Sequence, residues 1–84
     1  MQKIETMEWT QIQGLTNGQT YFIQASCDGY HNRKPLECSW VQDSAQPTDE
    51  KEGILAEGIK IKVTSNIWVK TSGLPAYINI EEVA

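Results

Sequence analysis

The sequence predicts a small all-β fold, an antiparallel β-sandwich or barrel of about six strands joined mostly by hairpins. Apolar and polar residues alternate with a period of two in several segments, and short turn-forming sequences separate these segments. No window has the three-and-four spacing of apolar residues that a core helix requires. Because the chain has only 84 residues, we expect a single domain over residues 1–84.

The first predicted hairpin joins Trp9–Leu15 to Thr20–Ser26 across Asn17-Gly18. This dipeptide favours a type I′ turn, because both of its residues accept positive φ. A two-residue loop would place Ile12 opposite Ile23. One face of the hairpin would then carry Ile12, Tyr21, Ile23 and Ala25, and the other would carry Trp9, Leu15 and Phe22. Both faces are apolar, so we expect the hairpin to be covered on both sides.

A second hairpin is predicted from the polar loop at 28–35 and a return strand at Leu36–Ser44. A register that pairs Cys27 with Cys38 extends the first apolar face to Trp40. A slip of two residues would keep the same faces, so the register stays open.

The C-terminal half predicts three further strands. Gly58–Thr64 alternates isoleucine and valine with lysine and threonine, which indicates a strand with one wet face. Ile67–Thr71 and Ala76–Val83 predict a third hairpin across 72–75. The charged run Thr48–Glu57 is expected to form a single helical turn at most.

Composition excludes several classes of partner. Seven basic and eleven acidic residues give a net charge of −4, which does not favour nucleic acid or an anionic membrane surface. No apolar stretch is long enough to span a bilayer. The N-terminal residues lack the apolar core of a signal peptide, so we expect synthesis in the cytoplasm.

Cys27, His31 and Cys38 are the residues that suggest chemistry, either as a cysteine–histidine pair or, with Asp28 or Glu37, as zinc ligands. The spacing lacks paired C-x-x-C motifs and shows no nucleophile–base signature. We therefore expect a protein that is not an enzyme and that has no cofactor and no metal. Whether the two cysteines are bonded stays open.

Aromatic side chains are the remaining candidates for a functional site. Trp68 alternates with Ile67 and Val69, and Tyr77 alternates with Ile78, so both are expected opposite the apolar face. Such residues anchor interfaces, stack on sugar rings, or cover a small core from outside. The candidates for an interface or a ligand site are Trp9, Phe22, Trp68 and Tyr77.

From Leu15 to Val83 the chain resembles small structural proteins of bacteriophages and prophages. The resemblance is carried, in order, by Gly14–Gln24, by Ala45–Thr48 with Gly53 and Gly58 after it, by Ile67–Gly73, and by Ala76–Glu82. It implies an all-β module associated with a head, tail or fibre, and it transfers no catalytic residue. The loop at 27–38 is richer in charge and cysteine than expected for such proteins, and residues 49–52 are more acidic than expected. Gly14–Tyr21 also resembles a corner late in fibronectin type III domains, a match set aside because this segment opens the chain.

The functional expectation is a non-catalytic virion structural or assembly module, made in the bacterial cytoplasm and located in the virion. It would act through contacts with identical copies, as a homo-oligomer, or with other virion proteins. The alternative is a carbohydrate-binding module whose exposed aromatics contact a host surface glycan. Neither hypothesis includes a nucleic-acid or membrane partner.

Overall fold

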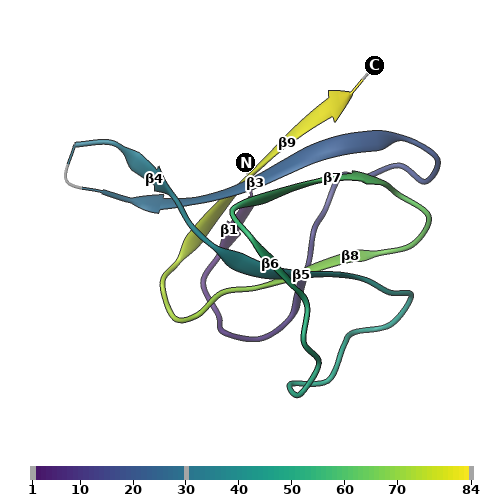
Figure 1. Cartoon of the computed structure of the whole chain (residues 1–84), viewed down its shortest axis with the longest axis horizontal. Helices are drawn as coiled ribbons and strands as arrows, with labels where there is room; N and C mark the ends of the chain where they lie inside the picture. Colours follow the sequence, from purple (N-terminus) through teal and green to yellow (C-terminus); the bar gives the residue numbers. More distant parts are fainter. Residues whose placement is uncertain (1, 30, 84) are drawn as a thin grey trace.

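The computed structural model describes residues 2–29 and 31–83, which form two antiparallel sheets. The first sheet contains β1 (Gln2–Ile4), β9 (Ala76–Val83) and β3 (Thr20–Asp28), with β4 (Arg33–Pro35) and β7 (Gly58–Lys62) both paired to the far side of β3. The second sheet has the order β2 (Thr10–Gln11), β8 (Ile67–Lys70), β5 (Cys38–Gln42), β6 (Ile54–Ala56). Figure 1 shows this arrangement. The predicted all-β fold is confirmed as a small sandwich.

The described residues contain no helix that is long and apolar enough to cross a membrane.

All three predicted hairpins are wrong, because in each of them the two predicted strands belong to different sheets. β2 pairs with β8, whereas β3, which follows it, lies between β9 and β7. Likewise, β8 and β9 belong to different sheets. The parity of the apolar residues was right, but Ile12 and Ile23 contribute to the core from opposite sheets and are not neighbours on one face. A sandwich satisfies the same alternation as a hairpin, because each sheet turns one face inward.

The Asn17-Gly18 turn carries the chain from one sheet to the other, and it is not type I′. Gly18 has φ 90°, whereas no described residue other than glycine has positive φ. The Gln19 N–H donates to the Thr16 carbonyl at 3.2 Å, which closes a type II turn with Gly18 at its third position. The Tyr21 hydroxyl accepts the Thr16 N–H at 3.0 Å. The hydroxyl of Tyr21 therefore ties the start of β3 to the backbone five residues upstream.

The predicted return strand Leu36–Ser44 contains β5 of the second sheet, so the second predicted hairpin does not form. A shorter hairpin forms in its place between β3 and β4, inside the segment predicted as a loop. Cys27 pairs with Lys34, not with Cys38, and the Leu36 N–H donates to the Ala25 carbonyl at 3.0 Å. The chain then leaves the first sheet to form β5. It returns between β6 and β7, where the Glu57 carbonyl accepts the Ala25 N–H at 2.9 Å. Both segments that cross between the sheets therefore bond to β3 at the same residue, Ala25. Cys27 and Cys38 are free thiols.

The core lies between the sheets and is built by both of them. Trp40 is 1% exposed, and its Nε1 donates to the Ala56 carbonyl at 2.8 Å. The residues predicted for the apolar face of the first two hairpins are all buried, although they are divided between the two sheets. The buried cluster consists of Ile4, Ile12, Tyr21, Ile23, Ala25, Cys38, Trp40, Val63, Ile67, Val69, Ala76 and Ile78.

Candidate functional site

Trp9 lies outside the core cluster and is nevertheless 2% exposed. The segment between β5 and β6, which projects as a long loop in Figure 1, covers the Trp9 side chain. Trp9 Nε1 donates to the Thr48 carbonyl at 3.0 Å, and Gln46 Nε2 donates to the Trp9 carbonyl at 2.9 Å. The Lys70 ammonium lies 5.8 Å from the ring centroid. We expected an exposed or interfacial Trp9; the structure corrects this, because the chain's own loop buries the side chain.

Gly53 lets this loop pass close to two tryptophans. A Cβ at this position would lie 2.7 Å from the Trp40 carbonyl oxygen and 3.0 Å from Trp9 Cη2. A contact of that length with a backbone atom is not tolerated by any other residue. The loop therefore enters β6 along a path that the absence of a side chain makes available.

The other three predicted aromatics are half-buried and lie apart from one another. Trp68 pairs with Val41 and Gln11 in the second sheet, and its Nε1 donates to the Asp43 carbonyl at 2.9 Å. Phe22 lies in the first sheet, opposite Lys60 on β7. The four candidates therefore do not form one site.

Tyr77 holds together one end of the first sheet. The Arg33 guanidinium carbon lies 4.0 Å from the ring centroid and the Lys3 ammonium lies 5.4 Å from it. The Tyr77 hydroxyl donates to Asp28 Oδ2 at 3.2 Å. Its neighbours thus come from β1, β3 and β4, so the ring joins the outer strands of the sheet.

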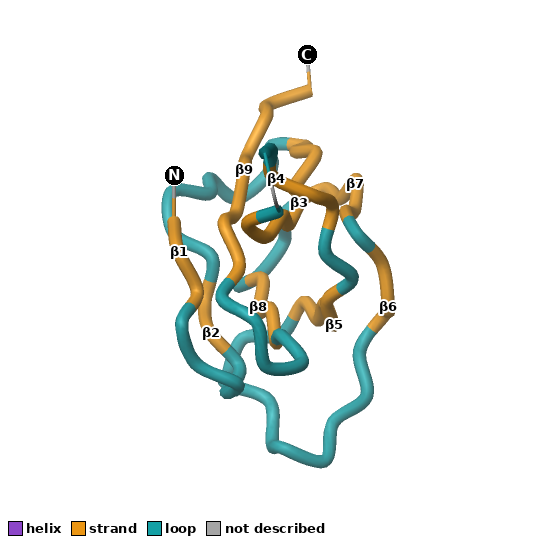
Figure 2. The backbone as a smooth tube through the Cα atoms, turned by 90° about the vertical axis from the view of Figure 1, so that its left-hand side faces the viewer, coloured by secondary structure: helices purple, strands orange, loops and turns teal. Residues whose placement is uncertain are grey.

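The most exposed large apolar residues are ones that the sequence patterns did not single out: Met7 (62%), Ile54 (68%), Leu55 (66%) and Leu74 (55%). Ile54 and Leu55 are adjacent and belong to β6, the edge strand of the second sheet. Figure 2 shows β6 at the outside of the molecule, with no drawn strand beyond it. The run Ile54-Leu55-Ala56 after a charged loop was the available sequence signal, and its assignment to a helical turn concealed it.

β6 differs in composition from the other edge strands among the described residues. β1 carries a lysine, β4 is Arg-Lys-Pro, β7 carries two lysines, and β2, the opposite edge of the second sheet, is the polar pair Thr-Gln. Charged residues and proline on an edge prevent pairing with another chain. β6 is Ile-Leu-Ala and has no such residue. It is therefore an edge strand whose side chains do not oppose further pairing.

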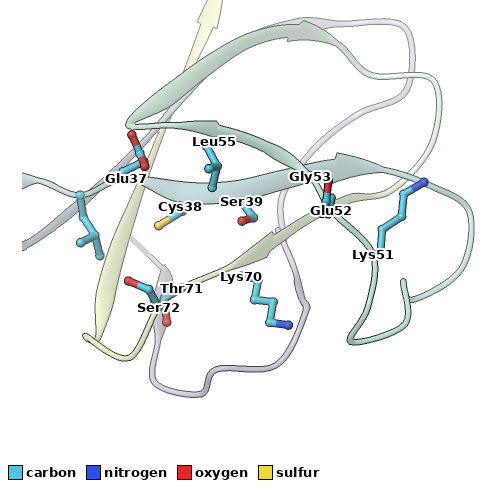
Figure 3. A pocket seen from close by; sticks show the side chains of 11 residues that line it. Glu37, Cys38, Ser39, Lys51, Glu52, Gly53, Leu55, Lys70, Thr71 and Ser72 are labelled. Carbon is cyan, nitrogen blue, oxygen red and sulfur yellow. The ribbon is translucent and has the colours of Figure 1, made fainter.

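A groove of about 670 Å³ lies beside β6 on the outer face of the second sheet. Leu55, Ser39 and Lys70 form a row across three neighbouring strands, as Figure 3 shows. Charges of both signs line the groove, from Lys51 and Glu52 near one end to Glu37 near the other. The surface can therefore offer apolar contact together with ion pairs.

Cys38 lines this groove but is not poised for nucleophilic chemistry. Burial is the main cause that raises the pKa of its thiol to about 11, and the nearby Cys27 and Glu37 act in the same direction. A thiol with this pKa stays protonated at neutral pH, whereas the thiolate is the reactive form.

Within the described ranges, no three histidine, cysteine, aspartate or glutamate side chains come together as a metal-binding group. The set considered for zinc is therefore not assembled there. Comparison with known proteins gives no match to a family model, to a curated protein or to a solved structure.

Proposed function

We propose that the chain is a structural or assembly module of a bacteriophage or prophage virion, and that its copies associate through the free edge of β6. The resemblance to small virion proteins and the all-β sandwich support the first part. The second part rests on one observation. β6 is an edge strand made only of apolar residues, two of which are about two-thirds exposed.

A second copy of this chain is the partner that fits the edge. In an antiparallel pair of β6 strands centred on Leu55, Ile54 faces Ala56 of the second copy, and Gly53 faces its Glu57. Lys51 of one copy then becomes a diagonal neighbour of Glu57 of the other, at a distance that long side chains bridge. The two-fold symmetry repeats this pair, so the edge is self-complementary in both shape and charge.

The expected dimer is weak when the copies are isolated. Complete burial of Ile54 and Leu55 from both copies would stabilise the dimer by about 1.5–3 kcal/mol for each of the side chains. Association costs ~4–15 kcal/mol in lost translational and rotational freedom. The two terms are comparable, so pairing depends on the high local concentration of a growing particle, where neighbouring contacts add to it.

The test is sedimentation equilibrium of the full chain over a wide concentration range. The wild type is expected to approach twice the 9.5 kDa mass of one chain as concentration rises. Leu55→Lys is expected to remain monomeric, because it places two like charges opposite each other on the two-fold axis. Leu74→Lys is the matched control, since Leu74 is similarly exposed but lies outside β6. Equal masses for wild type and Leu55→Lys at every concentration would refute pairing through β6.

Trp68→Ala distinguishes association through the edge of β6 from association through the outer face of the second sheet. Trp68 is half-buried on the outer face, two strands away from β6. With β6 pairing, Trp68→Ala keeps the wild-type association. Dissociation by Trp68→Ala, with β6 variants unaffected, would move the interface to the face.

Membership in a virion has its own test. Purified particles from the source strain after prophage induction are expected to contain peptides of this chain at a fixed ratio to the major capsid protein. A chain that is abundant in the lysate and missing from the particles would contradict the virion part of the proposal, whatever its oligomeric state.

A further inference from the structure

A hollow of about 570 Å³ lies on the outer face of the first sheet, on the other sheet from β6. The half-buried Phe22 lies at one end, and Ser26 lies further along the same strand. Gln24 and Asn79 are cross-strand partners, and both are exposed. One aromatic ring therefore lies beside two side-chain amides.

One feature keeps this surface open, and a second adds a charged donor to it. Gly58 pairs with Gln24, and a Cβ there would lie 3.1 Å from Gln24 Cγ and 2.9 Å from the Ile23 carbonyl oxygen. The missing side chain leaves the space above Gln24 clear. Arg33 also lines the hollow, and its guanidinium carbon lies 4.0 Å from the Tyr77 ring centroid. Stacking on the Tyr77 ring orients the N–H groups of the Arg33 guanidinium.

We propose that this hollow binds a saccharide, with the ring of Phe22 against a sugar face and the amides of Gln24 and Asn79 on its hydroxyls. Each amide offers both a donor and an acceptor, as a hydroxyl does. Directly opposed residues of an antiparallel pair have Cβ atoms about 5 Å apart, so the two amides contact one ring together. Arg33 and Lys34 are balanced in part by Glu57 on the same hollow, which does not favour a multiply charged anion.

The test is ¹H–¹⁵N NMR of the full chain, titrated with named sugars. The probes are the methyl β-glycosides of glucose, galactose and N-acetylglucosamine, methyl α-rhamnoside, maltotriose and chitotriose. At least one is expected to shift the side-chain amide signals of Gln24 and Asn79 in a saturable way. Saturable shifts confined to other parts of the chain, or no saturable shift with any probe, would overturn the proposal.

Variants locate the site. Gln24→Ala and Asn79→Ala are each expected to weaken binding about tenfold, which corresponds to the loss of one hydrogen bond to the ligand. Phe22→Leu keeps an apolar side chain and removes the ring, so binding is expected to be lost while the spectrum stays folded. Gln19→Ala changes an exposed glutamine outside the hollow and is expected to bind as the wild type does. Wild-type affinity in Phe22→Leu would contradict the assignment.

The aromatic ring and the two amides of the proposed site do not take part in association through β6, although Glu57 lines the hollow and also belongs to the proposed β6 pair. Leu55→Lys is expected to bind the same sugar with unchanged affinity, because Leu55 lies in the other sheet. Loss of sugar binding in Leu55→Lys would place the ligand elsewhere.

Discussion

Tyr21 shows how one hydroxyl determines a corner of this fold. Its ring is 6% exposed, and its oxygen accepts the Thr16 N–H just before the turn that leads into β3. Without that acceptor, a partly buried backbone N–H loses its partner. An unpaired group of this kind costs more than the net value of an ordinary hydrogen bond.

Tyr21→Phe is therefore expected to lower the free energy of unfolding by about 1–3 kcal/mol. Urea denaturation followed by tryptophan fluorescence measures this change. Tyr77→Phe is the matched control, because the hydroxyl of Tyr77 bonds Asp28 at an exposed position; its effect is expected to stay within about 0.5 kcal/mol. Equal losses in the two variants would show that the Thr16 bond does not stabilise the corner.

Cys38 makes stability depend on pH in the alkaline range. In the unfolded chain its thiol ionises near the ordinary pKa of 9.0, whereas burial holds the folded-state pKa at about 11. Between these values the folded state binds more protons than the unfolded state, so stability falls as pH rises.

The contribution of Cys38 is isolated by comparing the wild type with Cys38→Ala in urea titrations from neutral pH to pH 11. We expect the wild type to lose stability more steeply than the variant above pH 9. Parallel profiles would mean that the buried thiol does not ionise differently in the two states.

At the scale of elements, the loop from β5 to β6 is ordered by what it covers. Trp9 binds the Thr48 carbonyl, and Gly53 passes between Trp9 and Trp40. At the turn between β7 and β8, Gln42 Oε1 accepts the N–H groups of Thr64 and Ser65 at 2.8 and 3.2 Å. Single side chains thus tie irregular segments to strands that are distant in sequence.

Trp9→Phe keeps the apolar ring and removes the indole N–H. Residues 48–53 are expected to exchange amide hydrogens faster, with a global loss of about 0.5–1.5 kcal/mol, the usual net value of one hydrogen bond. Hydrogen-exchange mass spectrometry of that segment is the measurement. Trp68→Phe also loses an indole bond, but to Asp43, so residues 48–53 are expected to stay protected. Unchanged exchange in Trp9→Phe would show that the loop does not depend on this bond.

At the scale of the whole molecule, the two sheets present different surfaces. The second sheet ends in an apolar edge at β6, whereas the first sheet carries a hollow of one aromatic ring and two amides. Between them lies a single buried cluster to which both sheets contribute. The proposed association would extend one sheet sideways, and it would leave the outer face of the other sheet accessible.

Much of the core follows from the order of residues along the chain. Alternation placed Ile23, Trp40, Ile67 and Ile78 on apolar faces, and each is at most 1% exposed. The cross-strand partners did not follow, because face-to-face sheets and adjacent strands require the same alternation. The exposed edge at β6 was not predicted. The exposure of Ile54 and Leu55 depends on β6 being an edge strand, and that is a property of the sheet order.

What the sequence determined by itself is the location of most strands and the side of each that faces the interior, because these depend on side chains two residues apart. The tertiary structure decided which strands are neighbours, that the loop at 46–53 covers Trp9, and that β6 is left with a free edge. Those features depend on which of several compatible packings buries the most apolar surface. That choice is made by contacts between residues far apart in the chain.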